Sequence, residues 1–202
     1  MIDYPTLIGL LNKAEAEDEL RSRGYRYNAG TCFKLIYACY GRVCEVVRPR
    51  TVGAIHREIG LLKKSNVTVS DGLVRLDLKT EKQSVSRNNI HRVVWVSRVR
   101  QPDIYFSLVR LYDSTLGDDP FFDVSYRWVE LKFKKFFPFV RRGENVHLLR
   151  HWAATHYLQG FHTVVGGVPS FNKLAAHGGW SSYDTLYRTY HHLSSEDYKK
   201  DY

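Results

Sequence analysis

The chain has few of the features that mark secreted, membrane or metal-binding proteins. Its 202 residues include three cysteines, Cys32, Cys39 and Cys44, in a spacing that matches neither a disulfide framework nor a zinc ribbon. We therefore expect buried free thiols in a reducing compartment. No apolar run approaches the roughly 20 residues that a membrane-spanning helix needs, and the N-terminus lacks the basic and then apolar layout of a signal peptide. These absences predict a cytoplasmic protein with no membrane partner.

Acidic residues are also scarce. The chain has 21 aspartates and glutamates against 30 lysines and arginines, so its formal charge is +9. A basic surface favours a polyanionic partner, usually nucleic acid, although a membrane surface and simple solubility are alternatives. Hydrophobic residues make up 44% of the chain, which is enough for one ordinary core. No internal repeat or low-complexity tract interrupts it.

The hydrophobic pattern predicts a mainly helical α+β fold. An apolar helical run over residues 33–39 ends near Gly41, and further helices are expected over 103–115, over 125–142 and from about 146. Between them the periodicity changes to two over 67–69, 73–78 and 91–96, with Asp71 and Gly72 as a hairpin turn. This pattern predicts a small three-stranded antiparallel sheet. We expect a connector and short helix over 1–24, one domain over 25–193 and a polar tail over 194–202.

Two stretches near the C-terminus combine residues suited to phosphate chemistry. The first runs from His147 through Arg150 to Thr155 on a predicted helix, and its His and Arg are three residues apart. At this spacing the two side chains share a helix face and can converge on one anionic group. The second stretch begins Gly179-Trp180 and reaches Tyr190 ten residues after the tryptophan.

These stretches resemble the conserved boxes of the tyrosine recombinase (phage integrase) family. The second box of that family is His-x-Leu-Arg-His-x-x-Ala-Thr, and its third is Gly-His or Gly-Trp followed nine or ten residues later by the nucleophilic Tyr. A competing register uses His177 and Tyr187, but it loses the preceding Gly and the trailing His-Leu, so we prefer Trp180 with Tyr190. Its first box resembles the Arg-x-x-Glu that follows Gly41, although here no residue separates this Gly from the Arg.

The resemblance implies a catalytic fold with a defined set of site residues. Two arginines would clamp the phosphate, a histidine would act as base or phosphate donor, a tryptophan would contact the phosphate, and a lysine would protonate the leaving 5′ oxygen. Lys79 at the predicted hairpin is our choice for this lysine, with Lys82 second. The implied catalytic residues are Arg42, Lys79, His147, Arg150, Trp180 and Tyr190, with Glu45 orienting the cluster from behind.

Basic residues outside these boxes are candidates for DNA binding. The segment 125–142 interleaves lysines and arginines with aromatic residues, which suits a helix that packs inward and presents cations to phosphates, although a solvated face is the alternative. The loop between the second and third predicted strands adds two more cations. The predicted DNA-binding residues are Lys82, Arg87, Lys132, Lys134, Lys135, Arg141 and Arg142.

The resemblance implies strand cleavage and rejoining on double-stranded DNA through a 3′-phosphotyrosine, without ATP, metal or another cofactor. A homotetramer on DNA and a monomer in its absence are expected. The alternatives are a non-catalytic DNA-binding protein of the same fold and a type IB topoisomerase. A metal site is disfavoured although several histidines cluster in sequence, because no carboxylate stands in a His-Glu-x-x-His arrangement and no cysteine joins them. These histidines are His147, His151, His156 and His162.

Overall fold

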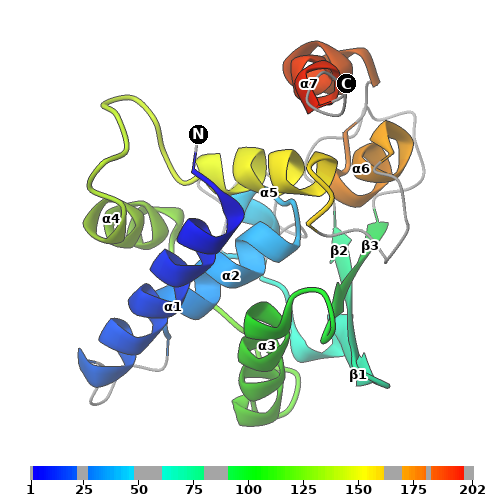
Figure 1. The fold of residues 1–202 in the computed structure, drawn as a ribbon. Helices are drawn as coiled ribbons and strands as arrows, with labels where there is room; N and C mark the ends of the chain where they lie inside the picture. Colours follow the sequence, from blue (N-terminus) through cyan, green and yellow to red (C-terminus); the bar gives the residue numbers. More distant parts are fainter. Residues whose placement is uncertain are drawn as a thin grey trace, which may run out of the picture.

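The computed structural model describes residues 2–21, 27–47, 61–79, 91–161, 170–180 and 183–197. Within these ranges the fold is mainly helical with one small antiparallel sheet, which confirms the fold class predicted from the sequence (Figure 1). The helices are α1 (Tyr4–Arg21), α2 (Ala29–Ala38), α3 (Pro102–Ser114), α4 (Tyr126–Phe136), α5 (Leu148–Leu158), α6 (Phe171–Gly178) and α7 (Tyr183–Asp197). The strands are β1 (Val67–Ser70), β2 (Leu73–Lys79) and β3 (His91–Ser97), and short 3-10 helices span Val43–Glu45 (η1) and Lys64–Asn66 (η3).

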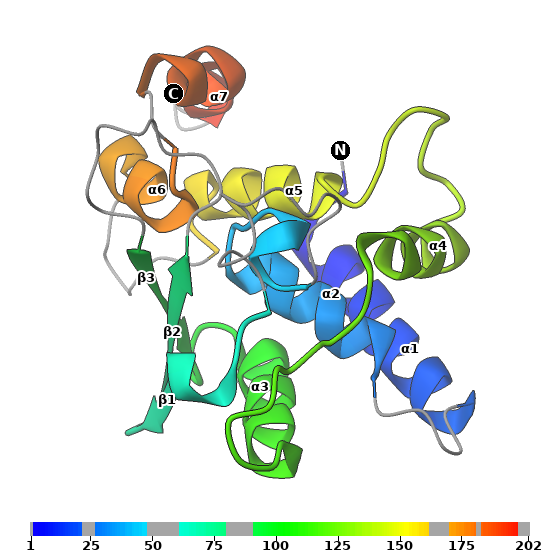
Figure 2. The ribbon, with the colours of Figure 1, turned by 180° about the vertical axis from the view of Figure 1, so that it is seen from behind.

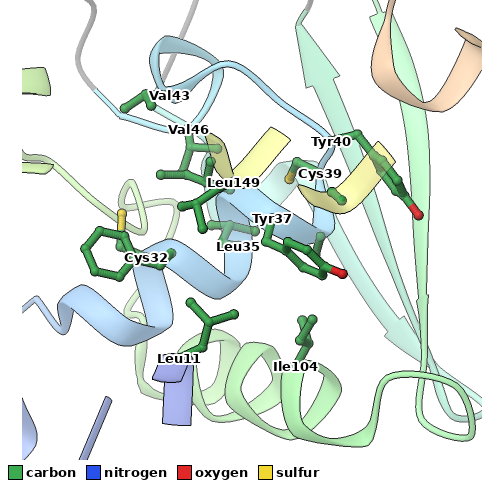
Figure 3. Packing of buried hydrophobic residues seen from close by; sticks show 14 of the residues in the cluster. Leu11, Cys32, Leu35, Tyr37, Cys39, Tyr40, Val43, Val46, Ile104 and Leu149 are labelled. Carbon is green, nitrogen blue, oxygen red and sulfur yellow. The ribbon is translucent and has the colours of Figure 1, made fainter. Parts of the chain in front are cut away.

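Helix α2 is the centre of the hydrophobic core. Every one of its residues is buried, and α1, α3, α4 and α5 all contact it (Figures 1 and 2). Figure 3 shows Leu11 of α1, Ile104 of α3 and Leu149 of α5 around this helix. The side chain of Asn28 caps its N-terminus by accepting a hydrogen bond from the backbone of Thr31 at 3.1 Å. Because α2 is held on all sides, the segment that follows it has a defined position.

Helix α1 is longer than the sequence predicted. The segment expected to be a connector with a short helix is an 18-residue helix, and its Leu7, Leu11 and Ala14 are fully buried in the same core as α2. Their spacing of four and three residues places them on one helix face. At Gly30 of α2 a Cβ atom would overlap the backbone of Glu15, so only glycine allows this close approach of the two helices.

The sheet has the order β1-β2-β3, with antiparallel pairing throughout. Asp71 and Gly72 form the turn between β1 and β2 with φ values of 47° and 74°, which is the left-handed geometry that tight hairpins need. Alternate residues of β2 and β3 are buried, and Leu78 lies opposite Arg92 in the register. The face that carries these two residues contacts the core, and α3 and α6 pack against the sheet.

The C-terminal helices cover the end of α5. Helix α6 ends at Gly179, whose φ of 64° lets the chain reverse into Trp180. Helix α7 contacts both α5 and α6 (Figure 1) and continues to Asp197, beyond the expected start of the polar tail. The three cysteines are buried and free, as predicted. Among the described residues, no helix is long and apolar enough to cross a membrane.

Candidate active site

Five of the six predicted catalytic residues lie together, where η1, the start of α5, the end of α6 and α7 meet. The guanidinium carbon of Arg150 lies 3.8 Å from the centre of the Trp180 ring, and the Trp180 and Tyr190 rings are 6.3 Å apart in an edge-to-face arrangement. Arg42 and His147 are close enough to act electrostatically on each other, and Arg42 also acts on Arg150. We call Arg42, His147, Arg150, Trp180 and Tyr190 the site cluster.

Arg150 fixes the centre of the cluster. Its side chain is buried, and Nη1 donates hydrogen bonds to the backbone oxygens of Tyr40 at 2.6 Å and Gly178 at 2.8 Å. These carbonyls belong to the ends of α2 and α6, where the helix dipole favours a cation. Burial, and then the nearby charge of Arg42, lowers the pKa of Arg150 to about 10. The guanidinium therefore stays charged at neutral pH, and its contacts hold η1 and Trp180 near each other.

A second buried arginine, Arg92 of β3, repeats this arrangement one residue earlier in each segment. Its Nη1 donates to the backbone oxygens of Cys39 at 2.7 Å and of His177. Its Nη2 donates to Oε2 of Glu45 at 2.6 Å, and both side chains of this ion pair are nearly fully buried. Arg92 and Arg150 thus join the ends of α2 and α6 through four hydrogen bonds, which go to two pairs of consecutive carbonyls, Cys39 with Tyr40 and His177 with Gly178.

Glu45 connects this framework to Arg42. Its carboxylate accepts a hydrogen bond from the backbone N–H of Arg42 at 3.0 Å and lies 3.4 Å from the Arg42 Nη1. A Cβ atom at Gly41 would stand 3.0 Å from the Glu45 carboxylate and 3.2 Å from the Arg92 guanidinium. Glycine therefore suits the position directly before Arg42, where the sequence departs from the family box.

Tyr190 is the tyrosine that points into the cluster. It is 4% exposed, and its hydroxyl lies 2.6 Å from Nδ1 of His151. Burial raises the pKa of its phenol to about 12, partly offset by the charge of Arg150. Tyr187 is 46% exposed; its ring stacks on Tyr183 and lies at a tilt to Phe171. The phenol of the preferred register is therefore the one beside Arg150.

The histidine of the competing register packs against two tyrosines of other segments. The His177 ring packs between Tyr40, 6.2 Å away, and Tyr157, 6.3 Å away. Its link to the site is through its backbone oxygen, which accepts from Arg92. The ring of His177 thus helps to pack α6, whereas the Trp180 ring stacks on Arg150.

His147 stands at the edge of the cluster, at the residue before α5. Its ring lies 5.1 Å from that of His151. Partial loss of hydration, followed by the nearby His151, Arg150 and Arg42, lowers the pKa of His147 to about 4, while Glu45 acts in the opposite direction. The imidazole is therefore neutral at pH 7 and can accept a proton or a hydrogen bond.

Lys79 is the predicted catalytic residue that the structure does not bring into the cluster. It is the last residue of β2, pairs with His91 and lies on the sheet face opposite Leu78 and Arg92. Its side chain is partly exposed at this end of the sheet, close to the contact between β3 and α6. Lys82 and Arg87 lie outside the described residues.

The basic residues of α4 and the loop after it divide into two groups. Lys134, Lys135, Arg141 and Arg142 are exposed. Lys132 differs from the expectation, because its ammonium group pairs with the buried carboxylate of Asp18 at 2.5 Å. Asp18 also accepts a hydrogen bond from the backbone of Ala29 at the start of α2. The structure thus assigns Lys132 to an ion pair within the fold.

Two residues of the site received no role from the sequence. His151 stands inside the second box, so its position was visible but its partner was not. Arg92 alternates with Val94 and Val96 along β3, which places a charged residue on the buried face of a strand, and this was a usable signal. Within the described ranges, no three side chains of His, Cys, Asp or Glu form a group that could hold a metal ion.

The assembled group is suited to an anionic phosphate. It offers two guanidinium groups, a neutral imidazole at the solvent-exposed edge and an indole around one protonated phenol, and Arg150 and the phenol are buried. Charge-assisted hydrogen bonds to phosphate oxygens are strongest where water is removed.

The chain has the fold of a tyrosine recombinase catalytic domain. It matches the XerH site-specific recombinase bound to a palindromic difH substrate in a post-cleavage complex, with a TM-score of 0.61, 16% identity and 96% of this chain covered. It matches XerH in a pre-cleavage complex with a TM-score of 0.56 and 18% identity over 89% of this chain. The catalytic domain of bacteriophage HP1 integrase matches with a TM-score of 0.55 and 18% identity over 96% of this chain.

The extent of these matches differs between the relatives. The chain spans 49% and 46% of the two XerH chains, which is about half of their length, but 88% of the HP1 catalytic domain. At such identities the likeness concerns the fold. No protein-family model matches the sequence, and no curated protein matches it significantly.

Proposed function

We propose that this protein is a site-specific DNA recombinase of the tyrosine type, which integrates or excises a viral, plasmid or similar mobile element. The observation that carries the proposal is the buried Tyr190 hydroxyl, which lies in one cluster with the stacked Arg150 and Trp180. A phenol with a pKa near 12 needs both a proton acceptor and nearby positive charge to become a nucleophile; Arg150 of the cluster supplies the charge, and the adjacent His151 is an acceptor within hydrogen-bond distance.

In the proposed reaction, the Tyr190 oxygen attacks a DNA phosphorus atom. The new oxygen–phosphorus bond forms as the bond to the 5′ oxygen breaks, which leaves a 3′-phosphotyrosine and a free 5′-hydroxyl. Arg42 and Arg150 stabilise the charge that builds on the non-bridging oxygens. Lys79, or Lys82 as the second choice, delivers the proton to the leaving oxygen. Because the phosphotyrosine conserves the bond energy, rejoining needs no ATP.

The proposed partner is double-stranded DNA, bound by a homotetramer during recombination. The formal charge of +9 and the exposed cations of α4 and the following loop support it. The matched XerH chains are bound to DNA substrate. Log affinity should fall with log salt concentration by about 0.9 per phosphate neutralised, and a flat response would count against duplex DNA.

A suicide substrate tests the proposal. Because the target site is unknown, the probe is a randomised pool of nicked duplexes in EDTA-containing buffer, and covalent adducts are detected by denaturing electrophoresis. The wild type should form an adduct, Tyr190→Phe should abolish it, and Tyr187→Phe should retain it as the matched control. An adduct that persists in Tyr190→Phe but is lost in Tyr187→Phe would overturn the assignment.

The other outcomes separate the alternative functions. Duplex binding without any adduct would indicate a non-catalytic DNA-binding protein. An adduct accompanied by relaxation of supercoiled DNA, but by no strand exchange between two selected duplexes, would indicate a topoisomerase. Strand exchange between the duplexes recovered from the adduct pool is the result that the proposal requires.

A further inference from the structure

The nearest proton acceptor to the Tyr190 hydroxyl is not the histidine that the sequence selected. Nδ1 of His151 lies 2.6 Å from that hydroxyl, a normal distance for a strong hydrogen bond to an imidazole nitrogen. The two rings are 6.0 Å apart and inclined by 43°. Among the contacts of the described residues, His147 reaches the His151 ring but makes no hydrogen bond to Tyr190.

The protonation states follow from the surroundings of the pair. Burial raises the pKa of Tyr190 to about 12. Burial, and then the charge of Arg150, lowers the pKa of His151. In the resting protein the proton therefore stays on the phenol, which donates to Nδ1, and the imidazole proton is on Nε2. The acceptor nitrogen is thus already directed at the only proton that the phenol must lose.

We propose that His151 is the catalytic base that takes the Tyr190 proton during strand cleavage and returns it during rejoining. The inference rests on the proposed function, because it concerns the same phenol. In cleavage, the Tyr190 oxygen bonds to phosphorus, its proton moves to Nδ1 of His151, and the departing 5′ oxygen takes a separate proton from the lysine. In rejoining, the 5′ oxygen bonds to phosphorus, and the phenol oxygen leaves and recovers its proton from His151.

The positions of the two histidines divide their tasks. His151 directly follows Arg150, and its ring faces α7 through Tyr190. His147 is one helical turn earlier, at the N-terminal end of α5, where the charges of Arg42 and Arg150 lower its pKa. We therefore assign His147 to hydrogen bonding with a phosphate oxygen. A purely structural His151 would only position α7 through its hydrogen bond to Tyr190. The experiment must therefore distinguish this positioning role from proton transfer.

The test compares His151→Asn with His151→Ala in single-turnover cleavage of a suicide duplex recovered from the adduct pool. The Asn Oδ1 atom can occupy nearly the same place as Nδ1 and accept the phenol hydrogen bond, but it does not take up the proton. General base catalysis contributes roughly 100- to 10,000-fold, so both variants should cleave at least about 100-fold more slowly than wild type. A positioning role alone predicts that His151→Asn cleaves like wild type.

A second measurement replaces Tyr190 with 3,5-difluorotyrosine, whose phenol is more acidic. If His151 removes the proton, 3,5-difluorotyrosine at position 190 should raise the cleavage rate of the His151→Asn variant at least about tenfold. The same change in His147→Asn should restore much less, because among the described contacts the hydrogen bond of the phenol is to His151 and not to His147. Equal rescue in both backgrounds, or none with His151→Asn, would overturn the assignment.

The failure of each idea gives a different result. Absence of an adduct from the wild type refutes the proposed function. A normal adduct from the wild type, together with wild-type cleavage by His151→Asn, refutes only the role of His151. Thermal unfolding of each variant checks that it is folded, and if His151→Ala does not fold, the His151→Asn and difluorotyrosine results decide the question.

Discussion

Replacement of Arg92 by Met should destabilise the protein strongly although Arg92 is not one of the predicted site residues. The side chain of Arg92 is 5% exposed, and that of its partner Glu45 is fully buried. The substitution removes the 2.6 Å ion pair and the donors to the backbone oxygens of Cys39 and His177. Glu45 then keeps its contacts with Arg42, to the backbone N–H at 3.0 Å and to Nη1 at 3.4 Å, but loses its closest cation.

The magnitude follows from the burial of the carboxylate. Removal of one partner from a buried ion pair costs about 3–5 kcal/mol, because the remaining charge has lost its closest counter-ion and does not regain its hydration. The total free energy of unfolding of a domain is about 5–15 kcal/mol. For a chain of this size each kcal/mol shifts the melting temperature by about 2–4 °C. We therefore expect Arg92→Met to lower it by about 6–20 °C.

Denaturant unfolding followed by circular dichroism measures the effect. Arg75→Met is the matched control, because Arg75 lies on the solvent face of the same sheet and its pair with Asp77 is 3.8 Å long and exposed. Such a surface pair contributes about 0–1 kcal/mol. In the double variant Arg92→Met with Glu45→Met, both charges are absent, so part of the lost stability should return.

The reasoning would be refuted if Arg92→Met cost no more than Arg75→Met. Such a result would mean that water reaches Glu45 in solution and replaces the guanidinium. A double variant less stable than Arg92→Met alone would also count against it, because the buried Glu45 charge without its closest cation would then not be the main source of the loss.

Three further predictions concern other parts of the structure. Gly178→Ala should displace the Trp180 ring, which a Cβ atom there would overlap, and should reduce adduct formation at least about tenfold. Lys132→Met should lower the free energy of unfolding by about 1–3 kcal/mol, because it leaves the buried carboxylate of Asp18 without this cation. Lys134 is exposed, so Lys134→Met should reduce DNA affinity and the salt dependence of binding without loss of stability. Stability should fall as the pH drops below about 6.5, because burial lowers the pKa of His156 in the folded protein. Below that pH the unfolded chain binds more protons than the folded one, which favours unfolding. His156→Gln should remove part of this pH dependence.

Each of these has its own measurement and contrary result. Gly9→Ala is the control for the glycine change, because a Cβ there meets nothing within 4 Å; equal adduct yields from both variants would contradict the packing argument. Equal unfolding midpoints for the two lysine variants would contradict the distinction between them. The pH series uses urea unfolding from pH 5 to 8, and an unchanged slope in His156→Gln would show that this imidazole does not carry the effect.

Features that depend on neighbours in sequence were predictable. The alternation along β2 and β3 and the left-handed Asp71-Gly72 turn are local properties, and the predicted sheet was confirmed. The spacing of His147 and Arg150 follows from helix geometry alone. The length of α1 was underestimated because its apolar face is narrow, and contact of this face with α2 stabilises the whole helix. The catalytic roles stay predictions until the adduct is measured.

By itself the sequence determined the fold class and the order of the candidate boxes, because periodicity and spacing act over a few residues. The tertiary structure alone decided which groups meet. Tyr187 and Tyr190 lie on the same helix, yet only the packing of α7 against α5 and α6 buries one and exposes the other. His151 is 39 residues from its phenol, and Arg92 is 47 residues from its carboxylate. Such pairs form only when the helices pack around α2, and this packing cannot be read from a local sequence pattern.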